Sequence, residues 1–494
     1  MKLTSDLTLN LGIRYDYLTN PLNALSYPAV DLNNLYGPIN TYVPVKPDKN
    51  NIAPRVGFAF VPHYGVFSDG KTVIHGGFGI YYDPFFTNIL VNSAQSSPVA
   101  PTGLLQSGAT GGLTGASTLI STITPAYSAN SSVQSVVNNI VNPQTFQWNF
   151  GVERELPLQL KATVNYVGAR GVKLYSNRQI NYQVFGVRPV ATRGLIAVRD
   201  NRANSSYNGL QVGVDRRFSK GLFVRGSYTY SKNLDNASEV FTTFASPTSY
   251  SANLAGDGLR QEWGNSAFDR RHVASFVYTY TPRGFRSDNR FADMFMSAFT
   301  RNITISGDTA FASGSYSTYN VSGRDTNGDS STTNDRPVLS NPSAPLNLVG
   351  VDGSYIGGTA NVYYDYAAYN ATLAKPSASR TRTPVNAGDV HFLVPSAVNG
   401  ATMVSREIGR TSFRNPGLQT WNVAVQKAIP TPFIHLEGSS FVFRCEAQDI
   451  GNHNNVRYLN PNVTLVGQST YLNPSNARDP NEFRHLRLWA KFVF

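Results

Sequence analysis

The sequence predicts an all-β protein, a transmembrane antiparallel β-barrel with short periplasmic turns and long extracellular loops. Three observations carry this prediction. Apolar and polar residues alternate with a period of two in one segment after another. Short connections between these segments alternate with long ones, as they do in membrane barrels. Apolar runs all fall short of the roughly 18 residues that a spanning helix needs, which excludes a helical membrane protein.

The strands of the predicted barrel follow from the alternation, taken in chain order. Residues 7–17 show the pattern, because the Leu, Ile and Tyr residues all have odd numbers and share one face. Most segments have the about 9–11 residues with which a strand crosses a membrane. With one or two further strands expected between 346 and 416, the total is about 12–14. The twelve predicted strands cover residues 5–18, 52–61, 71–83, 144–154, 159–169, 206–218, 221–231, 271–281, 296–311, 417–427, 436–449 and 482–494.

The connections between the predicted strands fall into two classes. The connections at 155–158 and 219–221 are short, whereas the long loops cover 84–143, 232–270 and 312–416. The long loops are rich in Ser, Thr, Asn and Gly. A barrel that keeps its turns inside and its loops outside explains why all the long connections occur at one end.

Composition agrees with this fold class and excludes others. Only 15% of the 494 residues are charged, whereas about 25% is usual in soluble proteins. The 28 Phe and 27 Tyr residues are too many for an acidic disordered chain. Cys445 is the single cysteine, so a disulfide scaffold is excluded, and its strand places it on the apolar face. The net charge of +12 is scattered along the chain, so we expect no nucleic-acid partner.

Charged residues on the polar face of these strands are expected to line a water-filled lumen. An Arg or Lys at the lipid-facing midplane costs about 2–4 kcal/mol, whereas a wet lumen tolerates charge. The apolar face would then contact outer-membrane lipid. The lumen-facing candidates are Arg14, Asp16, Lys161, Asp215, Arg225, Arg444, Glu446, Arg487 and Lys491.

One long loop carries a candidate calcium site. Asp325, Asn327 and Asp329 present oxygen atoms at alternate positions, and Asp335 is a candidate further ligand. The loop lacks the Gly and the Glu that an EF-hand requires at its later positions, so it is not that motif. The other interpretation is a polar turn closed by Asx-type hydrogen bonds. We expect no other cofactor.

A motif typical of soluble enzymes occurs in the sequence without the structural context that it requires. Residues 65–72 (GVFSDGKT) match a phosphate-binding loop, but the segment that follows is rich in Gly and β-forming residues. Such a segment does not form the helix whose N-terminus would bind phosphate. We therefore interpret these residues as a turn between two strands, and we expect no enzyme activity.

Nine segments, in this order, carry a resemblance to a known family: residues 7–17 (LTLNLGIRYDY), 51–60 (NIAPRVGFAF), 69–83 (DGKTVIHGGFGIYYD), 147–157 (QWNFGVERELP), 164–171 (VNYVGARG), 207–231 (YNGLQVGVDRRFSKGLFVRGSYTYS), 269–272 (DRRH), 325–337 (DTNGDSSTTNDRP) and 443–454 (FRCEAQDIGNHN). They resemble TonB-dependent outer-membrane receptors, particularly the Oar-like group. The resemblance spans nearly the whole chain.

This resemblance implies a barrel of about 22 strands with a plug in its lumen, of which this chain is the C-terminal part. In such proteins the plug and a short segment contact the energy-transducing TonB complex, and the proton-motive force drives substrate passage. We expect the signal peptide, the plug and the TonB-contacting segment to be missing from this sequence. Phe492 and Phe494 resemble the C-terminal signal of the barrel-assembly machinery, or they simply end a last strand.

Three functions remain open at this point. The first is the barrel of an outer-membrane TonB-dependent transporter or receptor, for uptake or export of an unidentified substrate. The second is a self-sufficient passive porin or adhesin-like barrel, which an even strand count with both chain ends on one side permits. The third is a soluble β-rich enzyme or binding protein.

Overall fold

Twelve antiparallel strands follow one another through a curved sheet in the described part of the computed structural model. In spatial order they are β1 (Leu7–Tyr15), β3 (Ile52–Phe60), β4 (Thr72–Tyr82), β6 (Gln144–Leu156), β7 (Leu160–Gln179), β8 (Ile196–Ser219), β9 (Leu222–Asp235), β11 (His272–Tyr280), β12 (Ile303–Ala312), β19 (Leu418–Pro430), β20 (Ser440–Gln448) and β21 (His485–Val493). The structure describes residues 2–17, 29–30, 34, 46–83, 89, 133–181, 187–192, 194, 196–239, 262–285, 287–328, 332, 335–396, 407–431, 439–453, 455–456, 459–473 and 484–494.

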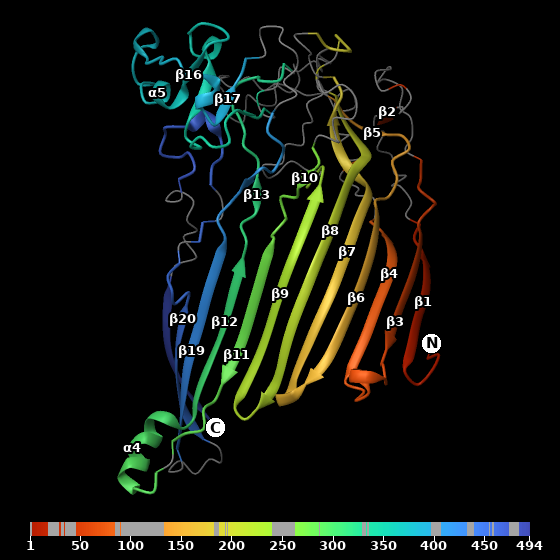
Figure 1. Cartoon of the computed structure of the whole chain (residues 1–494), viewed down its shortest axis with the longest axis vertical. Helices are drawn as coiled ribbons and strands as arrows, with labels where there is room; N and C mark the ends of the chain where they lie inside the picture. The colour runs from red at the N-terminus through yellow and green to blue at the C-terminus, as the bar shows by residue number, and fades with distance from the viewer. Residues whose placement is uncertain are drawn as a thin grey trace, which may run out of the picture.

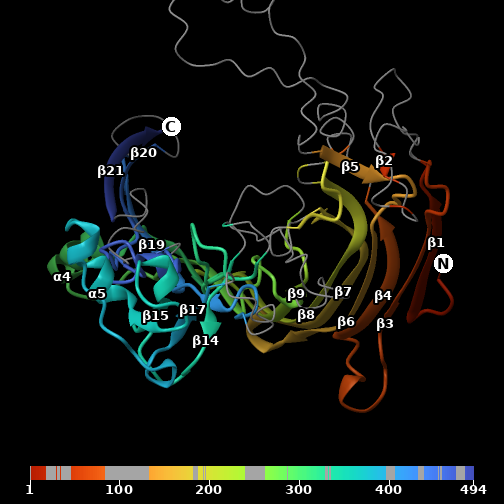
Figure 2. The same ribbon diagram turned by 90° about the horizontal axis from the view of Figure 1, so that it is seen from above.

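The sheet forms an open trough with β1 and β21 at its two edges (Figures 1 and 2). Among the described residues, β1 pairs only with β3 and β21 only with β20, so the sheet does not close on itself. The all-β antiparallel prediction is confirmed, and each of the twelve predicted segments overlaps one of the twelve strands. No helix in the described ranges is both long and apolar enough to cross a membrane.

One predicted strand begins too early, because its first residues form a helix. The prediction of a strand over 296–311 is wrong for its first seven residues: α4 (Arg290–Thr300) precedes β12. The Asn289 side chain caps this helix by accepting hydrogen bonds from the backbone N–H groups of Phe291 and Ala292. The connection from β11 to β12 is therefore not a short turn, although it lies at the short-turn end of the sheet (Figure 1).

Two strands extend well beyond their predicted ends. β7 has 20 residues and β8 has 24, and their pairing continues past register shifts near Gly171 and Leu174. The upper part of β8 also pairs in parallel with β5 (Val133–Val137), which pairs with β2 (Ala29–Val30). In this part of β8 neighbouring residues such as Ile196, Ala197 and Val198 are all buried, so both faces of the strand are covered. The alternation of apolar and polar residues that predicts a membrane strand is therefore lost.

The register keeps apolar residues on one face across the sheet. Directly paired residues point to the same side, and one row of them crosses nine strands through Leu7, Phe60, Ile74, Val152, Val164, Val212, Tyr228, Ala274 and Phe311. A second row continues over Ile305, Val425, Cys445 and Leu488. This apolar face is open: Leu11 and Leu488 are 71% and 80% exposed. An exposed apolar surface of this extent requires an apolar partner.

A large hydrophobic core lies outside the sheet, in the long connections at one of its ends. We call these connections, which include the described residues of 313–417, the loop layer. A small sheet of β14 (Val338–Leu339), β15 (Val349–Asp352), β16 (Tyr363–Asp365) and β17 (Phe392–Val394) packs with α5 (Tyr366–Asn370). The strands between 346 and 416 are short and lie outside the large sheet, so the one or two further barrel strands expected there are not found among the described residues. Because water surrounds this layer, it needs a core of its own, which includes Tyr319, Val321, Val349, Val351, Phe392, Val394 and Val463.

The remaining elements are short. β10 (Gly264–Asn265) pairs with β9, and β13 (Tyr316–Ser317) pairs with β18 (Phe413–Arg414). The described 3-10 helices are η1 (Gly65–Phe67), η2 (Pro157–Gln159), η3 (Gly353–Tyr355), η4 (Ser377–Ser379), η5 (Ala387–Asp389) and η7 (Val463–Leu465). After η1 the chain enters β4 and not a helix, so residues 65–72 form a turn between strands, as predicted.

Candidate functional site

The polar face of the sheet carries most of the predicted lumen residues. Lys161 of β7 lies opposite Asp215 of β8, which lies opposite Arg225 of β9. On the last two strands, Glu446 lies opposite Arg487. By the same register Arg14, Arg444 and Lys491 share this face, and Asp16 follows directly after β1. That this face lines a water-filled lumen stays a prediction.

The structure does not bring these charged residues into one site, but into separate groups of opposite charge. Near the loop end of β1, Arg14 Nε lies 2.7 Å from Asp16 Oδ1. On the middle strands, Arg225 Nε lies 2.5 Å from Asp215 Oδ1, and Lys161 binds Glu153 at 3.1 Å. On β20, Arg444 Nε lies 2.6 Å from Glu446 Oε1. Such exposed pairs contribute little to stability, and they leave a polar surface of mixed charge.

A groove of about 510 Å³ lies on the polar face where β1, β3, β4 and β6 meet. Its floor has no side chains, because Gly12, Gly57, Gly77 and Gly79 occupy neighbouring positions of three strands. A Cβ at Gly77 would lie 3.1 Å from the Val56 carbonyl oxygen and 3.2 Å from Asn149 Oδ1. Because glycine has no side chain, these positions leave space for a groove large enough to hold a ligand.

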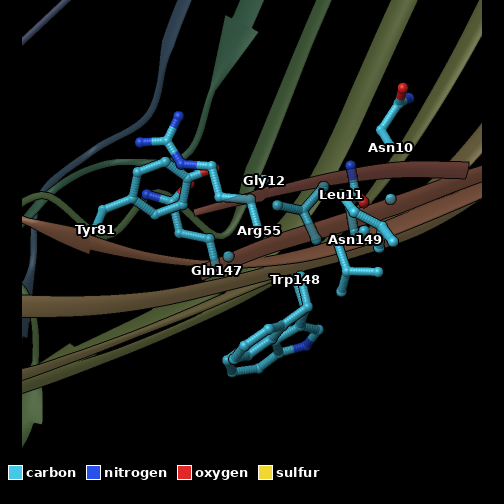
Figure 3. Close-up of a pocket in the computed structure, with 14 residues that line it drawn as sticks. Asn10, Leu11, Gly12, Arg55, Tyr81, Gln147, Trp148 and Asn149 are labelled. Atoms are coloured by element: carbon cyan, nitrogen blue, oxygen red, sulfur yellow. The ribbon is translucent and has the colours of Figure 1, made fainter. Parts of the chain in front are cut away.

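Polar side chains surround this groove. The Arg55 guanidinium carbon lies 4.6 Å from the centroid of the Tyr81 ring, a cation–π contact. Figure 3 shows Asn10, Arg55, Tyr81 and Gln147 on one side of the strands and Trp148 on the other. Arg55 is the one charged residue among those that line the groove. The groove thus presents a guanidinium, three side-chain amides and an aromatic ring to one space.

The groove residues are not among the candidate residues predicted from the sequence. Their signal is a run of Gly at alternate positions on the polar face, at Gly57, Gly77 and Gly79, beside amide and aromatic residues. Tyr81 faces the groove, where its ring contacts the Arg55 guanidinium, whereas its neighbour Tyr82 belongs to the apolar register.

A buried ion-pair network joins the loop layer to the top of β9. Arg410 is 1% exposed at its side chain, and its guanidinium binds the Asp235 carboxylate. The same guanidinium donates to the backbone oxygen of Glu262 at 3.1 Å and to the Ser238 hydroxyl at 2.9 Å. Arg336 Nη2 donates to Glu262 Oε2 at 2.5 Å. The network links segments that are up to 175 residues apart along the chain.

Glu407 lies beside this network and gives the loop layer a pH dependence. Burial raises its pKa to about 7, although the charge of Arg336 and the hydrogen bond from the Thr326 hydroxyl favour the ionised carboxylate. Between the ordinary value of 4.5 and about 7, the folded layer therefore keeps a proton that the unfolded chain loses. A proton held more tightly by the folded state stabilises it at low pH, and this stabilisation is lost as the pH rises through about 7.

We therefore expect the loop layer to resist protease better at pH 5 than at pH 8, because protonated Glu407 stabilises its folded state at the lower pH. Glu407→Gln, which resembles the protonated acid, will flatten this dependence. Digestion of both proteins across this pH range, with a protease whose own rate is corrected on an unfolded peptide, measures it. An unchanged slope in the variant would contradict the assignment to Glu407.

The candidate calcium loop is described in part. Asp325 Oδ1 accepts a hydrogen bond from the Gly328 backbone N–H at 2.6 Å, an Asx-type turn. Asp335 Oδ1 accepts from the Thr326 backbone N–H at 2.6 Å and from its hydroxyl at 2.8 Å. Asn327 is buried, and Asp329 lies outside the described residues. Within the described residues no group of three or more His, Cys, Asp or Glu side chains is arranged for a metal.

Calcium binding by this loop stays a prediction with a direct test. We expect added Ca²⁺ to slow proteolytic cleavage within residues 325–335, because a bound ion would tie its carboxylates together. Mg²⁺ at the same concentration is the control. Cleavage at the same rate with and without Ca²⁺ would sink the prediction.

The two C-terminal aromatic residues lie at the end of β21. The Phe492 ring packs on Phe441 of β20, with ring centroids 5.0 Å apart, and Phe494 is 83% exposed. The register also places Cys445 on the apolar face as predicted, opposite Val425 and Leu488. Recognition of Phe492 and Phe494 by the barrel-assembly machinery stays a prediction.

An antiparallel sheet with a continuous apolar outer face, a polar face and its long connections at one end defines an outer-membrane β-barrel protein. The chain belongs to the family described as outer membrane beta barrel domain, whose model matches residues 1–487. It is therefore located in the cell outer membrane, and the soluble alternative is wrong. A comparison with curated proteins finds no match.

Three solved structures illustrate the likeness to known barrels. The pyoverdine outer membrane receptor FpvA of Pseudomonas aeruginosa has 9% identity and a TM-score of 0.42, with 100% of this chain and 40% of that chain covered. The siderophore receptor PiuA of Acinetobacter baumannii has 9% identity and a TM-score of 0.41, with 100% and 41% covered. The outer membrane transporter YddB of Escherichia coli has 8% identity and a TM-score of 0.40, with 90% and 40% covered. This chain spans about two fifths of the length of these structures. These relatives are named as receptors and a transporter, not as enzymes.

Proposed function

We propose that this chain supplies part of the barrel wall of a TonB-dependent outer-membrane transporter or receptor of the Oar-like group. The substrate is unidentified, and the direction of transport is uptake or export. Membership of the outer-membrane barrel family and the ordered motifs of the sequence support the proposal. The observation that carries it is the polar face, which continues across the sheet opposite the apolar one and holds the glycine-floored groove.

In this proposal the polar face contacts a solute or a plug segment within the lumen. The guanidinium of Arg55 and the amides of Asn10, Gln147 and Asn149 can donate hydrogen bonds to oxygen atoms that enter the groove. The Tyr81 ring adds a flat surface. In this proposal the chain binds and orients a solute and lets it pass, and it catalyses no reaction.

Energy would come from the TonB complex through a plug segment that belongs to a longer protein. The barrel would be inserted by the barrel-assembly machinery, which would recognise Phe492 and Phe494. Both partners are part of the proposal, as is contact of the apolar face with outer-membrane lipid.

Planar-bilayer recording of the full-length gene product tests this function against the passive-porin alternative. A plugged transporter is expected to give little steady conductance and to bind the purified periplasmic domain of TonB. Large, steady conductance steps without TonB binding would overturn the proposal in favour of a porin. The gene itself gives a second test: an in-frame plug domain upstream of Met1 is expected.

A further inference from the structure

The helix α4 turns its apolar side away from the rest of the protein. Phe291, Phe295 and Phe299 recur every four residues, so they share one side of the helix. They are 76%, 65% and 64% exposed, although the rings of Phe295 and Phe299 contact each other. Figure 1 shows α4 beyond the short-turn ends of β12 and β19. The exposed side of this helix is therefore a stripe of phenylalanine.

The polar side of α4 is held by the segments that flank the helix. Asp293 accepts hydrogen bonds from the Ser287 backbone N–H at 3.0 Å and from the Arg301 guanidinium at 2.7 Å. The Thr300 hydroxyl accepts from the Phe285 backbone N–H at 2.9 Å. In water an amphipathic helix turns its apolar side towards the protein. The reverse orientation requires an apolar medium outside.

A rim of cations marks where the apolar face of the sheet ends, and the C-terminal end of α4 lies at this rim. Arg154, Arg216 and Lys427 are on the apolar register at the short-turn end, and all three bind polar groups there. The Lys427 ammonium donates to the backbone oxygen of Arg301, which caps the C-terminus of α4. Lys427 lies opposite Ile303, the first residue of β12, so this bond joins the helix end to the outer face.

We propose that α4 lies in the membrane interface on the short-turn side, with its three phenylalanines among the lipid acyl chains. The occupant of the apolar stripe is thus lipid, because Lys427 of the apolar register binds the end of this helix and so holds it next to the lipid-facing surface of the sheet. Arg283, which precedes the helix, and Arg290, its first residue, are exposed and can contact lipid phosphate groups. The helix anchors the barrel rim and does not cross the membrane.

Spin labels read by electron paramagnetic resonance test this anchor in the full-length protein, reconstituted in lipid vesicles. One label is attached at Phe295→Cys and the control label at Phe268→Cys, both in a Cys445→Ser background. Phe268 is also well exposed, at 69%, but lies at the long-loop end. Heat-modifiable migration on a gel confirms that each variant is folded before labels are compared.

We expect the label at 295 to relax more with oxygen, which dissolves in lipid, than with a water-soluble nickel chelate. The label at 268 will show the opposite preference. Equal access of the nickel chelate to both labels would overturn the proposal, since α4 would then lie in water. A label at 295 shielded from both reagents would also overturn it, in favour of a protein partner.

Discussion

Phe150→Arg is expected to destabilise the inserted barrel by about 2–4 kcal/mol, the cost of an Arg at the lipid-facing midplane. Phe150 lies in the middle of β6, on the apolar face, opposite Gly76 and Tyr166. Its side chain is 52% exposed, so in the membrane the new guanidinium would meet acyl chains and not a protein partner. The measurement is the fraction of protein in the outer membrane that keeps heat-modifiable migration.

The matched control is the neighbouring residue on the other face. Asn149→Arg introduces the same side chain one position away, where the register points to the polar face beside the groove. We expect near-normal insertion of this variant. Equal losses for the two variants would show that the face assignment is wrong.

Arg410→Ala is expected to destabilise the loop layer by about 3–5 kcal/mol, because it leaves the buried Asp235 carboxylate without its cation. Asp235 and Glu262 are 4% and 2% exposed, so water does not replace the lost guanidinium. The membrane part of the sheet does not depend on this network. Hydrogen exchange read by mass spectrometry should therefore show faster exchange in residues 313–417 and little change in β6 and β7.

An exposed arginine of the same layer provides the control. Arg414 on β18 is exposed, and Arg414→Ala should leave exchange in the loop layer nearly unchanged. If Arg410→Ala behaves like Arg414→Ala, the buried network does not hold the layer to β9.

The local pattern of the sequence predicts the strands of the sheet, but not what distant segments build together. Alternation over seven to nine residues is sufficient to place β1 or β6, because one side is apolar along the whole of β1 and from Phe146 to Val152 in β6. The groove needs Asn10, Arg55 and Gln147 to meet, and only the register of four strands brings them together. The pairing of Arg410 with Asp235, across 175 residues, likewise leaves no local signal.

The helix α4 shows a different limit of sequence reasoning. The sequence predicts a strand over 296–311, although only three of residues 296–302 are apolar. The cap at Asn289 and the four-residue spacing of the phenylalanines favour a helix over a strand. Its inverted orientation follows from the contacts of Asp293 and Thr300, which sequence alone does not show.

Cysteine accessibility along β6 tests most directly the claim that one face of this sheet meets lipid and the other water. Single cysteines replace residues 146 to 152 in turn, in a Cys445→Ser background, and react in intact membranes with a small, charged thiol reagent. The account predicts a period of two, with fast reaction at 147, 149 and 151 and slow reaction at 146, 148, 150 and 152. Uniform reactivity along the strand, or fast reaction at the even positions, would contradict it.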